Sequence, residues 1–157
     1  MKHKFIYFGS LFFLMLITGV FWGTWFTLTR SIESFSSDEF RHIGKVIIAN
    51  VALPMSIIMP LGILLMLLSI WFYNKKKSTG FYLGLLSFVL IIVTLLITLI
   101  VLVPIDNEIK EWTSTNLPNN WEAIRHKWET FHAMRTFTSL TSFAFFSLFI
   151  VINYDKK

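Results

Sequence analysis

The stretch FYLGLLSFVLIIVTLLITLIVLV, residues 81–103, runs for 23 residues without a charged side chain. At a rise of about 1.5 Å per residue, a helix of this length crosses the hydrocarbon layer of a bilayer, which is about 30 Å thick. The rest of the chain is similar, since 55% of its 157 residues are hydrophobic and only 15% are charged. A soluble domain this small cannot bury so much apolar surface. The composition therefore predicts an integral membrane protein with a single domain, residues 1–157.

Outside this stretch, three further apolar runs are long enough to span a bilayer. Together with the stretch itself they predict four spans, at residues 5–28, 46–73, 80–103 and 132–154. Long polar connectors, 29–45 and 104–131, follow the first and third spans, and a short basic turn follows the second. This arrangement predicts an all-α fold, a four-helix transmembrane bundle that runs up-down-up-down. We also expect a short interfacial helix before the fourth span.

Small and polar residues inside the spans indicate how the helices begin and pack. Ser36 or Ser37, followed by acidic residues, marks a helix start, because acidic side chains offset the helix dipole there. Gly19 and Gly23 form a small-xxx-small pair, which permits close approach of a second helix. Ser87, Thr94 and Thr98 lie near one face of the third span, so we expect them to point into the bundle.

The basic residues predict the orientation in the membrane. Seven of the 14 lysines and arginines lie in three short segments, namely the N-terminus, the turn Lys75–Lys77 and the C-terminus. The positive-inside rule then places both termini and this turn in the cytoplasm, for a multi-pass protein of the cell membrane. The net charge is +5, and we expect the excess basic side chains to interact with anionic lipid headgroups. No basic face carries interleaved aromatic residues, which argues against nucleic-acid binding.

The second long connector concentrates the functional groups of the chain. The segment VPIDNEIKEWTSTNLPNNWEAIRHKWETFHAMR, residues 103–135, holds three of the six tryptophans and two of the four histidines. Five of its side chains recur at steps of four, three, four and three, which aligns them on one helical face. They are Trp121, Arg125, Trp128, His132 and Arg135.

The predicted topology brings this face next to polar ends of the other spans. These ends contribute Trp25 from the first span, Asn50 from the second, and Asp106 with Asn107 from the third. Arg135 either faces the bundle with a carboxylate partner, Asp106 or Glu129, or extends to the headgroups as an anchor. His132 is either an interfacial residue or a general base. The tryptophans belong either to the interfacial belt or to the walls of a pocket for a flat apolar ligand.

A metal site is an alternative use of the same region. Glu39-x-x-His42 and Glu129-x-x-His132 each place a carboxylate and an imidazole one helical turn apart, as in di-iron carboxylate bundles. Further ligands would come from Asp106, Glu108 or Glu122, but those carboxylates lie in connectors and not in a bundle core. We therefore predict no metal and no cofactor. The chain has no cysteine, which excludes disulfides and thiolate chemistry.

An ordered set of residues identifies a family resemblance. The run Val103-Pro104-Ile105-Asp106-Asn107 is followed by Trp121, Arg125, Trp128-Glu129, His132 and Arg135-Thr136. This order resembles the signature of the anthrone-oxygenase-like proteins, which are small four-helix membrane proteins. The family pattern often has Asn directly after Pro-x, where this chain has Asp106 and then Asn107.

The resemblance implies an activity and assigns roles. The members of this family that have an assigned activity oxidise anthrones to anthraquinones, with molecular oxygen and without a conventional cofactor. By that resemblance His132 is the expected base, Arg135 and Asn107 stabilise the anion, and Trp128 stacks on the ring. The remaining substrate-binding residues are Arg125, Trp121, Asn50, Asp106 and Trp25. The alternative is a membrane protein without catalysis, which binds a lipid-like ligand or serves as a structural or interaction subunit.

Overall fold

The computed structural model describes residues 2–154, and four of the helices in that range are long and apolar enough to span a membrane. In chain order the elements are α1 (Lys2–Thr27), η1 (Thr29–Ser34), α2 (Ser37–Trp71), α3 (Thr79–Ile97), η2 (Thr98–Leu102), α4 (Val103–Glu111) and α5 (Trp121–Tyr154). No strand occurs among these residues. The predicted all-α, four-span fold is confirmed.

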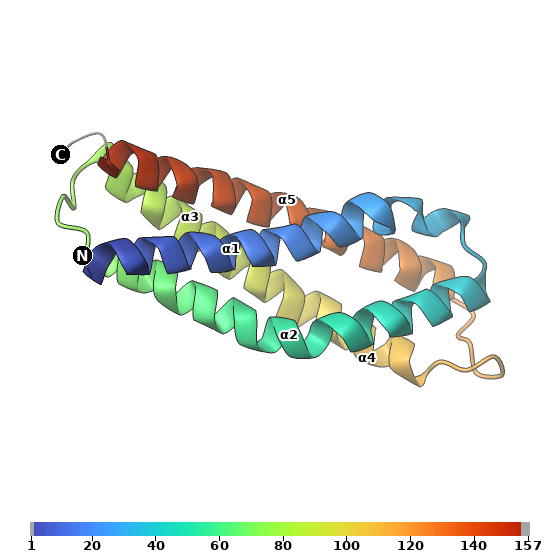
Figure 1. The fold of residues 1–157 in the computed structure, drawn as a ribbon. Coiled ribbons are helices and arrows are strands. Elements are labelled where there is room, and N and C mark those ends of the chain that lie inside the picture. The colour runs from blue at the N-terminus through green and yellow to red at the C-terminus, as the bar shows by residue number, and fades with distance from the viewer. Residues whose placement is uncertain (1, 155–157) are drawn as a thin grey trace.

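The four long helices alternate in direction (Figure 1). The beginning of α1, the end of α5 and the turn between α2 and α3 lie at one end of the bundle. The elements η1 and α4 lie at the other end. Helix α3 packs along α5, and α1 packs along both α2 and α5, whereas α2 and α3 touch over a short stretch only. The bundle is therefore loosest between α2 and α3.

The helix starts follow the local sequence. Ser36 is the N-cap of α2 and forms a capping box with Glu39, in which each residue satisfies a backbone N–H of the other. This confirms the predicted start. Ser78 caps α3 in the same way, by accepting a hydrogen bond from the N–H of Phe81.

The half of the bundle that includes the beginning of α1 and the end of α5 has a closed core. Leu14, Ile17, Ile91, Phe146 and Phe149 are completely buried there. Pairs of small residues allow the helices to approach, and a Cβ atom added to Gly62 would lie 2.9 Å from Ile17 Cδ1. The predicted close packing at Gly19 and Gly23 is absent, because nothing lies within 4 Å of a Cβ added at either position.

The opposite half is organised by η1, α4 and the beginning of α5. Ile32, Phe40, Ile109 and Trp128 are completely buried in a second core, where Phe40 contacts Trp128 edge-on at a centroid distance of 5.8 Å. The short helix differs from the expectation. Residues 121–131 are continuous with the fourth span in α5, and the separate short helix is α4. Of the basic ends used for orientation, Met1 and Asp155–Lys157 lie outside the described residues.

Candidate functional site

A cavity of about 420 Å³ lies within the half of the bundle closest to α4. Its walls come from α1, α2, α3, η2, α4 and α5, so it forms only when the whole bundle is assembled. Most of its lining is apolar, including Phe21, Met55 and Met59. The polar part of the wall is formed mainly by Asp106, Trp128, His132 and Arg135.

These four residues form a connected group. Trp128 Nε1 donates a hydrogen bond of 2.8 Å to Asp106 Oδ1. The Trp128 and His132 rings lie 3.9 Å apart between centroids. Arg135 Nη2 lies 3.0 Å from His132 Nδ1. Helix α5 aligns Trp128, His132 and Arg135 by its periodicity, and Asp106 reaches Trp128 from a separate helix, α4.

The contact between Arg135 and His132 decides the tautomer of the imidazole. A guanidinium has only N–H donors and cannot accept a hydrogen bond. His132 Nδ1 must therefore be the acceptor, and the ring proton of the neutral imidazole lies on Nε2. His132 consequently presents an N–H donor, and not a lone pair, at its free nitrogen.

Two buried donors of this group have no protein partner. His132 is 5% exposed and Arg135 is 7% exposed, and neither His132 Nε2 nor Arg135 Nε makes a hydrogen bond to a described residue. The Arg135 guanidinium carbon lies 4.1 Å from the centroid of the Phe21 ring, which stabilises its charge by a cation–π contact. Unpartnered buried donors are costly, on the order of 1–3 kcal/mol each, so their position at a cavity wall indicates a place for an acceptor.

The cavity reaches the outer surface of the bundle between α2 and η2. Several of its lining residues there are exposed, namely Ala52, Ser56 and Pro60 of α2 and Leu99 of η2. Helix η2 is a π-helical turn, a feature that is frequent at functional sites because it widens the helix locally. These exposed residues belong to helices of membrane-spanning character, so the opening faces the surface that lipid would cover.

The structure brings together only part of the predicted site. His132, Arg135, Trp128 and Asp106 line the cavity. Asn107 is exposed and accepts a hydrogen bond from Lys110 Nζ at 3.1 Å, and Asn50 is exposed on α2. Neither asparagine lines the cavity.

The other three predicted residues are engaged elsewhere. Trp25 packs on Phe137 at a centroid distance of 4.9 Å. Arg125 stacks on Trp121, and its Nη1 donates a hydrogen bond of 2.9 Å to the Phe35 carbonyl. The first contact joins α1 to α5, and the hydrogen bond of Arg125 joins α5 to the chain segment after η1, so both hold this end of the bundle together.

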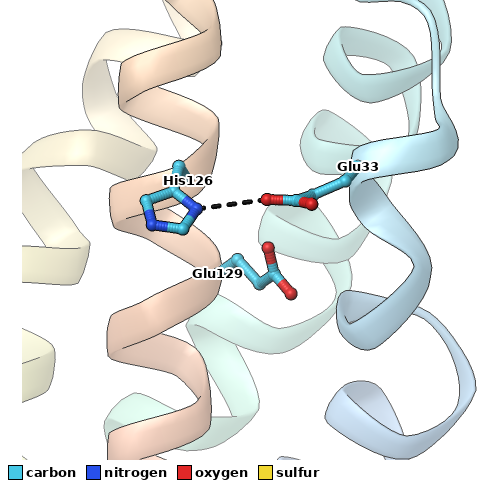
Figure 2. A group of neighbouring side chains, drawn as sticks. All are labelled: Glu33, His126 and Glu129. Atoms are coloured by element: carbon cyan, nitrogen blue, oxygen red, sulfur yellow. Dashed lines mark hydrogen bonds and ion pairs between the residues drawn. The ribbon is translucent and has the colours of Figure 1, made fainter.

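The two Glu-x-x-His units are not arranged as a bundle-core metal site. Glu39 is bonded to Ser36 as part of the helix cap. Glu129 points to a different surface hollow from His132, where Glu33 and His126 are its neighbours (Figure 2).

The apolar part of the cavity wall has no distinctive pattern in the sequence. Phe21, Met55, Met59 and Leu95 are ordinary members of apolar spans, and no local signal distinguishes them from residues that face lipid. The prolines of α2 are the one available sign, because Pro60 lines the cavity.

Fold and site together define a multi-pass, four-span helical membrane protein with a mostly apolar cavity inside the bundle, one wall of which carries a polar group. The family model for anthrone oxygenase matches residues 45–145, a range that includes Asp106, Trp128, His132 and Arg135. The chain belongs to the anthrone oxygenase family. Neither the curated proteins nor the solved structures include a match.

Proposed function

We propose that the cavity binds a flat, apolar molecule with an acidic C–H group conjugated to a carbonyl, and that the protein oxidises this group with O2. The observation that carries the proposal is the placement of two unpartnered donors and one carboxylate on the wall of an otherwise apolar cavity. Such a site suits a ligand with one polar end, since apolar walls hold the rings and a few polar groups fix the orientation.

The donors are suited to the carbonyl oxygen of the ligand. His132 Nε2–H and the Arg135 guanidinium would both donate to that oxygen. When the C–H proton leaves, negative charge develops on the oxygen, and donors already in place stabilise it. Arg135 also holds the imidazole in the required tautomer through its 3.0 Å contact with Nδ1.

The carboxylate of Asp106 is the base that best fits this arrangement. Its Oδ1 accepts the Trp128 hydrogen bond, and no described residue donates to its other oxygen, which is free to accept a proton. Trp128 therefore positions the base. This assignment reverses the roles expected from the family resemblance, in which His132 is the base. The reason is that the lone pair of Nδ1 is already used by Arg135.

The reaction balances without a cofactor. Removal of one proton from the methylene leaves an electron-rich enolate, which transfers one electron to O2. The resulting radical pair combines to form a C–O bond and, after protonation, a hydroperoxide. Loss of water from the hydroperoxide gives a ketone, so the net change is CH2 + O2 → C=O + H2O. The four electrons that reduce O2 come from the substrate.

The opening between α2 and η2 would admit such a substrate directly from the bilayer. Both O2 and flat hydrocarbons partition into lipid, and the exposed lining residues Ala52, Leu99 and Val103 offer them an apolar entrance. In the proposed orientation the termini and the turn Lys75–Lys77 are cytoplasmic, and the cavity lies in the outer half of the cell membrane.

Oxygen consumption by purified protein in lipid nanodiscs tests the proposal, with anthrone as the substrate. We expect uptake well above the spontaneous rate in protein-free nanodiscs. Asp106→Asn and His132→Ala should each remove most of this uptake, while a retained melting temperature shows that the bundle is intact. Uptake that never exceeds the protein-free rate with anthrone or another activated methylene would overturn the proposal.

A second function, binding of a lipid-like ligand without turnover, is favoured by the membrane-facing opening. It predicts that a flat fluorescent ligand binds with 1:1 stoichiometry and that Arg135→Met weakens this binding, although no oxygen is consumed. The two functions share the cavity, so oxygen uptake is the measurement that separates them.

A further inference from the structure

We propose that Glu33, His126 and Glu129 form a binding site for a divalent transition-metal ion, with Zn²⁺ as its best-suited occupant. The site lies between η1 and α5, on a different surface of α5 from the cavity (Figure 2). It does not depend on the proposed oxidation.

The ligand atoms of the three side chains already converge. His126 Nδ1 lies 3.1 Å from Glu33 Oε1, and one ligand atom from each of the three residues lies within 4.8 Å of the others. Zinc binds nitrogen and oxygen ligands at about 2.0–2.2 Å, which places atoms that share the ion roughly 3–4 Å apart. Small side-chain rotations therefore complete the site.

The donor set determines which ion fits. One imidazole and two carboxylates give three protein ligands of mixed N and O character, with room for water at the remaining position. Calcium and magnesium prefer sites made of oxygen ligands only. Ions that prefer thiolate ligands are disfavoured, because the chain has no cysteine.

The charges around the group favour a cation. Glu33 and Glu129 are two carboxylates that lie close together, and among the described side chains neither has a Lys or Arg within ion-pair distance. Arg125 lies one turn before Glu129, but its guanidinium stacks on Trp121 and is bonded to the Phe35 carbonyl. A bound cation would neutralise the repulsion between the carboxylates.

The scaffold holds the ligands in place. On η1, Thr29 and Ile32, which precede the exposed Glu33, are completely buried and hold the 3-10 helix against the bundle. On α5, His126 and Glu129 are one turn apart, and the completely buried Trp128 anchors the helix between them. The three ligands also line one surface hollow, together with Thr130 and Met134, so the ion would bind in a concave site.

A bound ion would link η1 to α5, because its ligands come from both elements. Glu33 and His126 are 93 residues apart in the sequence. We therefore expect a rise in melting temperature when Zn²⁺ is added to the metal-free protein.

Calorimetric titration of Zn²⁺ into the full chain tests the site, after chelator treatment and removal of any histidine tag. We expect one equivalent of Zn²⁺ to bind. Glu33→Gln, His126→Gln and Glu129→Gln should each weaken binding at least tenfold, and each should abolish the Zn²⁺-dependent rise in melting temperature. The matched controls are Glu108→Gln and His42→Gln, which change an exposed residue elsewhere and should bind as the unmodified protein does.

The absorption spectrum of bound Co²⁺ supplies a second measurement. Visible bands of a low-coordinate ion should appear with the unmodified protein and disappear in His126→Gln. Binding that is equally strong in all three ligand variants, or a stoichiometry far below one, would overturn the proposal. Because the ligand side chains are exposed or half-buried, the melting temperature of each metal-free variant should match that of the unmodified protein.

Discussion

The two halves of the bundle bury polar residues in different ways. In the half with the beginning of α1 and the end of α5, Ser87 Oγ donates to the Ser142 carbonyl at 2.7 Å, and Ser142 Oγ donates to the Ser87 carbonyl at 2.8 Å. Ser10 and Ser69 are paired at 2.8 Å between α1 and α2. In the half with α4, His132 Nε2 and Arg135 Nε are buried beside a cavity and make no hydrogen bond to any residue in the range 2–154. The same four helices thus form a satisfied core at one end and an unsatisfied site at the other.

This contrast distinguishes residues that stabilise the fold from residues that we propose bind a ligand. Buried polar groups between helices are stabilising when each donor meets an acceptor. Unpartnered groups lower stability, and a fold that retains them commonly uses them for binding or catalysis. If the two halves differ in this way, substitutions in the α4 half should change activity and substitutions in the packed half should change stability.

The largest effect is expected from Asp106→Asn. An amide cannot take up the proton, so oxygen-dependent turnover of anthrone should fall by roughly 10²–10⁴-fold, the usual contribution of a general base. Steady-state oxygen uptake in nanodiscs measures the loss. Glu111→Gln, which changes an exposed carboxylate on the same helix, should retain full activity. Equal activity of both variants would show that Asp106 is not the base.

A smaller effect, on stability, is expected from Gly62→Val in the packed half. A Cβ at this position would lie 2.9 Å from Ile17 Cδ1 and 3.3 Å from Phe13 Cβ, so the added methyl groups overpack α1 against α2. We expect a loss of about 1–3 kcal/mol in unfolding free energy, measured by denaturation in mixed micelles. Gly19→Val is the matched control, because its Cβ meets nothing within 4 Å. A similar loss of unfolding free energy in both variants would show that Gly62 is not packed more tightly than Gly19.

Closing the mouth of the cavity should reduce turnover with little change in stability. Ala52→Trp fills the opening between α2 and η2, so we expect about a tenfold fall in kcat/KM for anthrone, equivalent to about 1.4 kcal/mol. Leu53→Trp, on the neighbouring exposed position that does not line the cavity, serves as the control. Unchanged kcat/KM in Ala52→Trp would indicate that the substrate enters by another route.

The smallest effect is expected from Ser87→Ala. It removes one donor from the reciprocal pair with Ser142, and hydrogen bonds between membrane helices contribute about 0.6 kcal/mol on average. Unfolding free energy should fall by about that amount, and oxygen uptake should not change. A loss of activity without a loss of stability would mean that the two halves are not separable.

The sequence predicts the fold and the part of the site that comes from a single helix. Span positions follow from hydropathy, and the start of α2 follows from Ser36 and Glu39, since both depend on neighbouring residues only. The periodicity of Trp128, His132 and Arg135 placed them on one face of one helix, and they do share the cavity wall. The sequence also predicts Asn50 and Asn107 in this pocket, because they lie at the same end of their spans as His132. Their side chains are exposed, since rotation about a helix axis depends on packing with neighbouring helices.

Local sequence properties define the class of the molecule, namely four apolar helices in a given order and membership of the anthrone oxygenase family. These properties depend only on the composition and spacing of residues that are close together in the sequence. Only the tertiary structure decided that Asp106 meets Trp128, that Arg135 fixes the tautomer of His132, and that Glu129 turns away to Glu33 and His126. Each of these contacts depends on the distance and direction between side chains in the assembled bundle, which no periodicity within one segment specifies.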